Sequence, residues 1–304
     1  MAEPKKKSRR RFILGGLSVA GALVVGWGML PPRQRLNASR PLPVENGEVA
    51  LNGWIKIGAD GIVSVVMHKS EMGQGIHAAL QMLVAEEMDL PMSMVRPMHA
   101  SMDKIYGNVA VFPESLPFHP DNQGKIKQGA QWMVAKLARE LGVQMTGGSS
   151  SIKDAWGPMR EAGAIARSML LVAAAKEWGA SPDQCRTRDG AVHHADGRRL
   201  GYGDLAAKAA YAEPQELRLK DPGDFKLIGK SQPRTDTIFK VNGEAKYGID
   251  ARPADLLYAA VRMCPQIGGT LKKFDADAVK SMRDVVQVVD CNGAGGRARR
   301  CRAG

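Results

Sequence analysis

Glu71-Met72-Gly73-Gln74-Gly75 separates a segment of β-strand character from a segment of helical character, and so indicates how the chain folds. Residues 51–67 group their apolar side chains on either side of a turn at residues 58–61, which predicts a β-hairpin. After the glycine loop, apolar residues recur at helical spacing, at Leu80, Leu83, Val84 and Met88. A hairpin, a glycine loop and a helix in this order indicate a fold of the α+β class.

A second glycine-rich stretch, Thr146-Gly147-Gly148-Ser149-Ser150-Ser151, also leads into a predicted helix. Ser151 and Asp154 fit a capping box, and Gly179 is placed to end the helix. One face of this helix carries small or flexible residues, at Met159, Ala162, Ala166, Met169 and Ala173. We therefore expect the helix to pack closely against a neighbour.

Both glycine-rich stretches have the composition of an anion-binding site. Glycine lets a ligand approach the backbone, and the N–H groups at a helix start have no intrahelical acceptor, so they can bind anionic oxygen. Gln74 adds an amide that can donate and accept, and the three serines add hydroxyl groups. A glycine-rich helix start is more often only structural, so neither stretch identifies a site by itself.

The rest of the chain is less informative. Residues 31–48 are rich in proline and polar side chains, and we expect a linker there. Residues 89–124 carry scattered prolines and are expected to be irregular, whereas residues 125–141 have a helical pattern. Residues 180–222 predict short strands and turns, and residues 225–290 predict a second unit that is first strand-rich and then helical.

The chain has a net charge of +12, most of which is concentrated at its two ends. This distribution excludes nucleic acid as the main partner. The first 30 residues contribute +5 and the last 14 contribute +4, which leaves +3 for the 260 residues between them. That balance is ordinary for a soluble surface. The four cysteines form no C-x-x-C pair, so structural zinc and an iron–sulfur cluster held by this chain are not expected.

The amino terminus has the pattern of an export signal. Arg9, Arg10 and Arg11 precede an apolar run at residues 12–30, which is 19 residues long and close to the length that spans a bilayer. Paired arginines directly before Phe12 resemble a twin-arginine signal, so we expect export by that route to the periplasm. An ordinary Sec signal and an uncleaved anchor in the inner membrane are the alternatives.

The last fourteen residues, 291–304, change character, because glycine and arginine replace the apolar periodicity that precedes them. We expect this tail to be aberrant and disordered. A shifted reading frame, a truncation and a natural end are the explanations that remain open.

Four stretches together resemble the molybdopterin-binding (large, or beta) subunit of the xanthine dehydrogenase/aldehyde oxidase family, in its isoquinoline 1-oxidoreductase beta-subunit type. They are residues 71–75 with the following helix, residues 146–160 (TGGSSSIKDAWGPMR), residues 225–229 (FKLIG) and residues 240–250 (KVNGEAKYGID). Their order and spacing agree with the family as well as their motifs do. The resemblance runs from about Leu51 to Asp290, as in an N-terminal fragment of the permuted bacterial type.

The resemblance implies a domain organisation and a set of cofactor-binding residues. It implies a signal or anchor at residues 1–35, a partial molybdopterin-binding α/β domain at 36–222, and the start of a hammerhead α/β domain at 223–290. In the family, the two glycine-rich segments contact the molybdenum–pterin cofactor. Carried over residue by residue, this role falls on Met72, Gly73, Gln74, Gly148, Ser149, Ser150 and Ser151.

The resemblance also implies an oxidoreductase that hydroxylates aldehydes or N-heterocycles with water as the oxygen source. Its cofactor is molybdenum–molybdopterin in the cytosine dinucleotide form, and its electrons leave through a small partner subunit with 2Fe–2S clusters and then to cytochrome c. The glutamate base of the family is expected outside this chain, so no catalytic residue or metal ligand is nominated. We therefore expect the chain alone to be inactive. A membrane-tethered, non-catalytic fragment and an extracytoplasmic protein that binds a small ligand are the alternatives.

Overall fold

The computed structural model describes residues 27, 30, 34–45, 47–119, 121–261, 265–270, 272–273, 275–283, 285–288 and 298–302. The chain forms two compact units, residues 1–237 and residues 238–304. The predicted signal or anchor at residues 1–35 lies outside the described residues, except for Trp27, Leu30, Gln34 and Arg35. Within the described part of the chain, no helix combines the length and apolar character needed to cross a bilayer.

A four-stranded sheet forms the centre of the first unit, with the strand order β1-β2-β3-β4. Its strands are β1 (Val49–Ala50), β2 (Ile55–Ile57), β3 (Val63–Met67) and β4 (Val95–His99). The first three strands are antiparallel neighbours, which confirms the predicted hairpin, whereas β3 and β4 run parallel. The carboxyl ends of β3 and β4 therefore lie at the same edge of the sheet.

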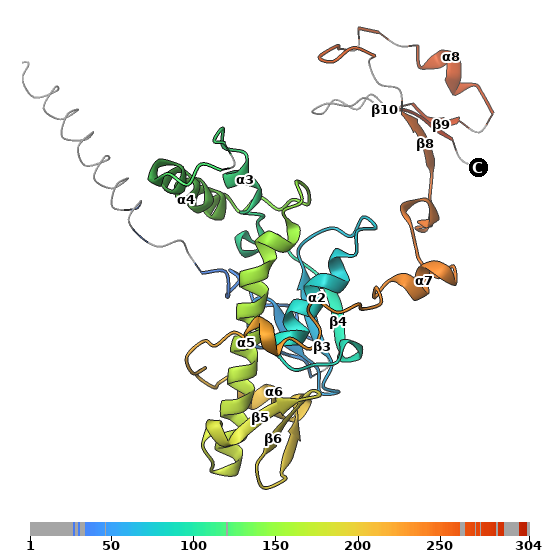
Figure 1. Ribbon diagram of the computed structural model, residues 1–304. Helices are drawn as coiled ribbons and strands as arrows, with labels where there is room; N and C mark the ends of the chain where they lie inside the picture. Colours follow the sequence, from blue (N-terminus) through green and yellow to red (C-terminus); the bar gives the residue numbers. More distant parts are fainter. Residues whose placement is uncertain are drawn as a thin grey trace, which may run out of the picture. The chain divides into compact units, whose positions relative to one another are not determined.

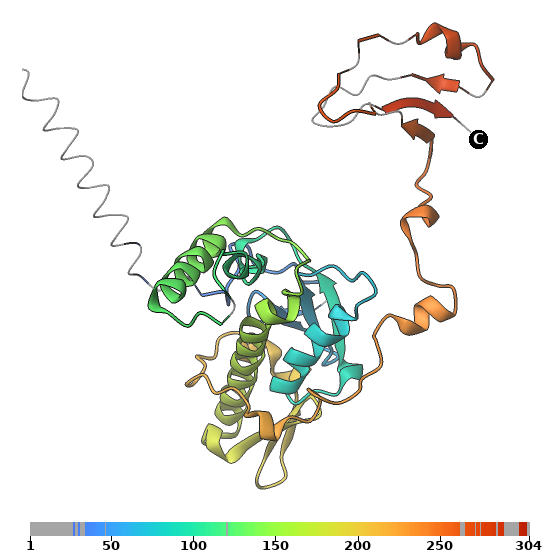
Figure 2. The same ribbon diagram turned by 45° about the horizontal axis from the view of Figure 1, so that its top comes forward.

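Helix α2 (Ile76–Glu87) connects β3 to β4 through a short 3₁₀ turn, η1 (Met92–Met94). The four apolar residues predicted for its packing face are all buried. Helix α5 (Ser151–Trp178) lies alongside α2 (Figure 1), and the view in Figure 2 shows the same pairing. The two helices approach closely at Gly163, where an added Cβ would lie 2.9 Å from the Cβ of Glu87. This approach explains the small-residue face that the sequence predicts.

Three helical elements of the described chain lie between β4 and α5. They are η2 (Lys104–Tyr106), α3 (Val111–Glu114) and α4 (Lys125–Leu141). The predicted helix at 125–141 is confirmed, and Gly142 ends it in the left-handed conformation, with φ 64°.

A small antiparallel sheet and a helix follow α5. After η3 (Pro182–Gln184), the strands β5 (Cys185–Arg188), β6 (Ala191–His194) and β7 (Arg199–Gly201) pair in sequence order. Helix α6 (Tyr202–Ala209) then packs against α5. Tyr202 is fully buried, and its hydroxyl donates to the carbonyl of Met88 at 2.6 Å.

A strap at residues 220–228, which contains η4 (Pro222–Asp224), is attached to the end of α2. The buried carboxylate of Glu86 accepts three backbone N–H groups of the strap, from Lys226, Leu227 and Ile228. The sequence places the start of a second domain at residue 223, whereas the chain divides at residues 237 and 238. The difference arises because these hydrogen bonds hold the FKLIG segment on the first unit.

The second unit is built from short elements. They are α7 (Thr237–Val241), which starts at the last residue of the first unit, η5 (Gly248–Asp250), β8 (Tyr258–Val261), α8 (Asp277–Lys280), β9 (Val285–Gln287) and β10 (Ala298–Arg302). Strand β10 lies between β8 and β9 and is antiparallel to both. Residues 298–302 of the predicted disordered tail are therefore paired as a strand in this sheet. The other residues of the tail lie outside the described residues.

Two further predictions are wrong in part. Residues 89–124 were expected to be irregular, yet they contain β4, because Pro97 is tolerated on an edge strand whose N–H side needs no partner. Residues 180–222 were expected to hold only strands and turns, yet they contain α6.

Candidate functional site

The first glycine-rich loop is organised around the carboxylate of Glu71. Its Oε1 accepts the N–H groups of Gly73 and Gly75, each at 2.9 Å, and its Oε2 accepts the N–H of His77 at 3.1 Å. Burial would raise the pKa of Glu71, but these hydrogen bonds and the charge of Arg234 outweigh it and hold the pKa below its usual value. Glu71 therefore occupies the anion-accepting start of α2 from within the chain.

In this arrangement the N–H groups at the start of α2 and the amide of Gln74 have hydrogen-bond partners within the chain. The Oε1 of Gln74 accepts the N–H of Met72 at 2.6 Å, and its Nε2 donates to the carbonyl of Ser70 at 2.9 Å. Two groups of the loop still face outward. The Met72 side chain is 68% exposed, and no atom lies within 4 Å of the Cβ position of Gly73.

The second glycine-rich loop leaves its helix start open. Ser150 is the N-cap of α5, and no described side chain makes a capping hydrogen bond to this end of the helix. The first N–H groups of α5 have no intrahelical acceptor. Gly148 and Ser149 are exposed and have positive φ, at 62° and 51°, and the Cβ position of Gly147 meets no atom within 4 Å. The two loops look alike in sequence, but only the second retains the anion-accepting groups.

Asn108 braces the second loop from behind. Its backbone N–H donates to the carbonyl of Val143 at 2.8 Å, and its side-chain amide donates to the carbonyl of Met145 at 3.2 Å and to the Oγ of Ser150 at 2.7 Å. Ser150 is buried, and its hydroxyl donates to the carbonyl of Gly147 at 2.7 Å. Of the predicted serines, Ser150 is therefore structural, and Ser149 is the one that is exposed.

Asp154 connects the two loops, and the predicted capping box with Ser151 is wrong. Its buried carboxylate accepts two hydrogen bonds from Arg35, at 2.9 and 3.1 Å, one from Lys69 at 3.0 Å and one from the N–H of Val109 at 2.8 Å. Burial would raise the pKa of Asp154, but its cationic neighbours and hydrogen bonds hold the pKa far below its usual value. Capping motifs are read from local spacing, which cannot reveal partners so far away in the chain.

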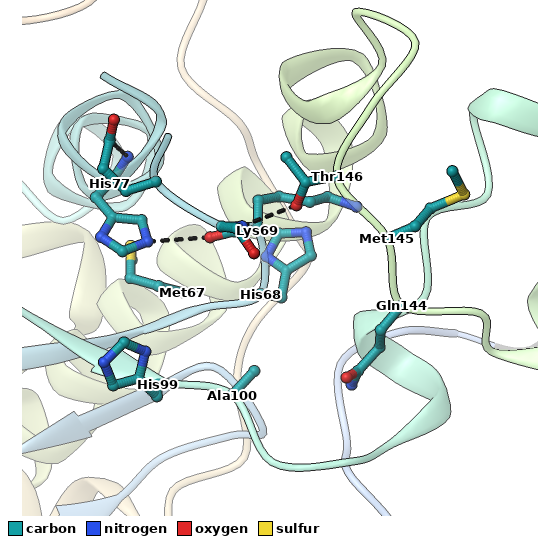
Figure 3. A pocket seen from close by; sticks show the side chains of 11 residues that line it. Met67, His68, Lys69, His77, His99, Ala100, Gln144, Met145 and Thr146 are labelled. Carbon is teal, nitrogen blue, oxygen red and sulfur yellow. Dashed lines mark hydrogen bonds between the residues drawn. The ribbon is translucent and has the colours of Figure 1, made fainter. Parts of the chain in front are cut away.

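A cavity of about 600 Å³ lies at the carboxyl ends of β3 and β4, and each predicted segment reaches it through one residue, whereas none of the seven predicted cofactor-binding residues lines it. Glu71 contributes from the first segment and Thr146 from the second, and the N–H of Ser70 donates to the Thr146 hydroxyl at 2.8 Å. Figure 3 shows His77 and His99 on one side of this cavity and Gln144 and Met145 on the other. Crevices outside the carboxyl ends of parallel strands are common ligand sites.

His68 is the cavity residue that sequence reasoning missed. Its side chain is fully buried, and neither ring nitrogen has a hydrogen-bond partner among the described residues. Its Nε2 lies 3.7 Å from the carboxylate of Asp154, beyond hydrogen-bond distance. Burial lowers the pKa of His68 to about 4, so the ring is neutral at pH 7. A signal was available, because His68 and Lys69 are polar residues that directly follow a buried strand.

Comparison with known proteins supports the resemblance. The family model of the molybdopterin cofactor-binding domain matches residues 11–111. The chain is 28% identical to the beta subunit of isoquinoline 1-oxidoreductase from Brevundimonas diminuta, over 94% of this chain and 37% of that protein. It is 29% identical to the membrane-bound aldehyde dehydrogenase (pyrroloquinoline-quinone) of Gluconacetobacter polyoxogenes, over 94% of this chain and 33% of that protein.

A third relative is a nicotinate dehydrogenase subunit of Pseudomonas putida, 27% identical over 90% of this chain and 21% of that protein. Among solved structures, quinoline 2-oxidoreductase of Pseudomonas putida 86 is 17% identical over 54% of this chain and 17% of that chain, with a TM-score of 0.33. The chain spans between a fifth and two fifths of the length of the curated relatives. The predicted resemblance is confirmed: this chain is similar to the molybdopterin-binding subunits of the xanthine dehydrogenase/aldehyde oxidase family, of the isoquinoline 1-oxidoreductase beta-subunit type.

Proposed function

We propose that this chain holds a molybdopterin cofactor between its two glycine-rich loops, as the cofactor-binding part of an oxidoreductase. In this proposal, residues 36–222 are part of the molybdopterin-binding domain and residues 223–290 begin a hammerhead domain. The observation that carries the proposal is that both predicted segments border one cavity at the carboxyl ends of β3 and β4.

The donor groups of this cavity, and of the start of α5 that follows Thr146 in the chain, fit an anionic ligand that also carries hydrogen-bonding groups. The start of α5 offers N–H groups that no described side chain caps. In the buried cluster behind the cavity, the cations Arg35 and Lys69 share one carboxylate, Asp154, which leaves an excess of positive charge. His68 is a buried polar ring without a partner among the described residues, and an unsatisfied buried group costs roughly 1–3 kcal/mol unless a ligand or water pairs with it.

Each residue would have a distinct part in holding the cofactor. Gly148 and Ser149 would bring backbone and hydroxyl donors to its phosphate or pterin oxygens, because both are exposed at the open start of α5. Met72 and Gly73 would line its apolar surface, since the amide of Gln74 is already bonded within the loop. The bound cofactor would supply the two-electron oxidation that side chains do not perform.

Glu71 does not provide a general base, although it lines the cavity. Three backbone N–H groups bind its carboxylate and hold its pKa below the usual value, so it is a weak proton acceptor near neutral pH. Glu71 is therefore not assigned the role of the family's glutamate base.

The proposed substrates are aldehydes or N-heterocycles, which are hydroxylated with oxygen from water. Two relatives are named for the N-heterocycles isoquinoline and nicotinate, and one is named as an aldehyde dehydrogenase. Electrons would pass to a small 2Fe–2S subunit and then to cytochrome c. The cytosine dinucleotide form of the cofactor, export by the twin-arginine route and anchoring in the inner membrane belong to the same proposal.

Hydrogen exchange tests where the cofactor binds. The full chain is purified from bacterial cells that make molybdopterin and, as the matched control, from cells of the same strain that lack its synthesis. We expect the amides of Ser151, Ile152 and Lys153 to be protected only in the first preparation, and those of Gly75 and His77 to be equally protected in both. Equal exchange at the start of α5 in the two preparations contradicts the proposed binding mode.

A further inference from the structure

Arg234 lies against the first glycine-rich loop, although 161 positions in the chain separate it from Gly73. Its Nη1 donates to the carbonyl of Gly73, and its Nη2 donates to Oε1 of Glu71 at 3.2 Å. A Cβ added at Gly75 would lie 4.0 Å from its Cγ. One side chain from the end of the first unit therefore contacts the loop at three of its residues.

The carboxylate of Asp236 fixes the orientation of the Arg234 guanidinium. Its Oδ1 accepts the Nε–H at 3.0 Å, and its Oδ2 accepts an Nη2–H at 2.8 Å. A bidentate pair of this kind sets the plane of the guanidinium, which a single hydrogen bond does not. All three nitrogen atoms of the guanidinium are therefore engaged, two of them with the loop. An ion pair between two freely mobile surface side chains lacks this geometry and contributes little.

The first loop requires a contact from outside, because two glycines with little conformational preference form its backbone. Gly73 and Gly75 have φ of 99° and 81°, in the region that favours glycine, and glycine loses more freedom than other residues when it is fixed. Arg234 binds the Gly73 carbonyl and the Glu71 carboxylate, which itself holds the N–H groups of the loop. The outward side stays accessible, since the Met72 side chain is 68% exposed.

The chain segment that carries Arg234 is attached at both ends of α2. The strap at residues 220–228 is bound by Glu86 at the end of the helix, and Arg234, further along the chain, contacts the loop that precedes the helix. Helix α7 then begins at Thr237, the last residue of the first unit. The chain that enters the second unit is therefore tied to the loop that is proposed to face the cofactor.

We propose that Arg234 is a positioning residue of the cofactor site, which fixes Glu71 and the Gly73 carbonyl so that the first loop presents Met72 and Gly73 to molybdopterin. Arg234 acts through the loop rather than by touching the cofactor. The inference rests on the proposed function. It adds a residue from outside both glycine-rich loops, and it gives the segment before the second unit a part in retaining the cofactor.

Hydrogen exchange of the full chain without cofactor tests the contact itself. The chain and its variants are purified from cells that lack molybdopterin synthesis. In Arg234→Gln, we expect the amides of Gly73, Gly75 and His77 to exchange about tenfold faster, because hydrogen bonds to a charged group are lost, while amides in the middle of α5 keep their rates. Arg218→Gln, at a side chain that is 84% exposed, is the control and should change no rate. Unchanged loop rates in Arg234→Gln, or equal acceleration in α5, overturn the proposal.

Retention of the pterin tests the consequence for the cofactor site. The same variants and Arg234→Lys are purified from cells that make molybdopterin, and the release of pterin is followed during dialysis. We expect Arg234→Gln and Arg234→Lys to release it about tenfold faster than the unmodified chain and Arg218→Gln, because lysine keeps the charge but not the planar fork. Release at the unmodified rate from either Arg234 variant overturns the positioning role. An unmodified chain without pterin contradicts the proposed function and the cofactor role of Arg234 together, whereas the exchange result still decides whether Arg234 holds the loop.

Discussion

The ammonium of Lys69 donates a hydrogen bond to the carboxylate of Asp154, with Nζ and Oδ2 3.0 Å apart and both side chains almost fully buried. Lys69 lies two residues before Glu71, and Asp154 lies in the first turn of α5. The ion pair therefore joins the loops that border the cavity. Any change that breaks it is expected to move the two loops relative to one another.

Asp154→Asn is expected to destabilise the first unit by about 3–5 kcal/mol, because it leaves Arg35 and Lys69 buried without a counter-charge. The measurement is the urea midpoint of unfolding. Asp121→Asn is the control, since the Asp121 side chain is 91% exposed, and it should change the midpoint little. Equal midpoints for the two variants would show that the cluster does not stabilise the fold.

The stability of the chain is expected to fall as the pH decreases from 6.5 to 4, because of His68. Burial depresses its pKa from 6.5 to about 4, so in this window the unfolded state binds a proton that the folded state excludes. The loss reaches about 3 kcal/mol at the acid end, at about 1.4 kcal/mol per pKa unit. The stability that the ionised carboxylate of Asp154 contributes is lost separately, at a pH below 3.8, which is the pKa of an aspartate in the unfolded chain.

The pH effect can be assigned by comparing two histidine variants. His68→Gln should flatten the dependence of the urea midpoint between pH 6.5 and 4. His99→Gln, at an exposed ring of the same cavity, should preserve it. A slope that persists in His68→Gln would show that another group titrates in this window.

Two glycine-to-alanine changes in α5 are expected to have opposite signs. Gly163→Ala should destabilise by about 1–3 kcal/mol, since its Cβ would lie 2.9 Å from the Cβ of Glu87 and 3.2 Å from the carbonyl oxygen of Val84. Gly157→Ala should stabilise by about 0.5–1 kcal/mol, because its Cβ would meet only the Glu161 carboxylate, at 3.8 Å. Thermal unfolding of both variants checks the signs, and a stabilising Gly163→Ala would refute the close packing of α2 and α5.

Glu86→Gln is expected to loosen the strap at residues 220–228. The N–H groups of Lys226, Leu227 and Ile228 all donate to one carboxylate oxygen of Glu86, Oε2, at 2.7–3.0 Å. An amide oxygen in its place is a neutral acceptor, which makes weaker hydrogen bonds than a carboxylate does. We expect faster hydrogen exchange at these amides and faster tryptic cleavage after Lys226. Glu177→Gln, in an exposed ion pair with Lys208, should leave both rates unchanged. An unchanged exchange rate in Glu86→Gln would mean that other contacts hold the strap.

Local periodicity was sufficient to predict the hairpin, α2, α4 and α5, because each of these elements has a continuous apolar pattern and a glycine at a boundary. It missed β4, since Pro97 is typical of loops and the parallel pairing with β3 depends on residues far away in the chain. It also missed α6, whose eight residues are too short to give a clear helical pattern.

The candidate site was predictable in its location but not in its hydrogen bonding. Glycine composition located both loops, but it could not show that Glu71 fills one helix start while the other stays open. Asp154 fitted a capping motif locally, and only the fold reveals its partners Arg35 and Lys69. His68 gave no recognised motif, because its importance arises from burial without a partner among the described residues.

Cofactor binding between the two loops is best tested by the molybdenum and pterin content of the full chain purified from cells that make molybdopterin. We expect both in the unmodified chain and in Gly223→Leu, and their loss in Gly147→Leu. Neither glycine has an atom within 4 Å of its Cβ position, so a side chain can begin at both without a clash, but only Gly147 lies in the second loop. Equal content in the two variants, or pyrroloquinoline quinone in place of the pterin, would contradict binding of molybdopterin at the second loop.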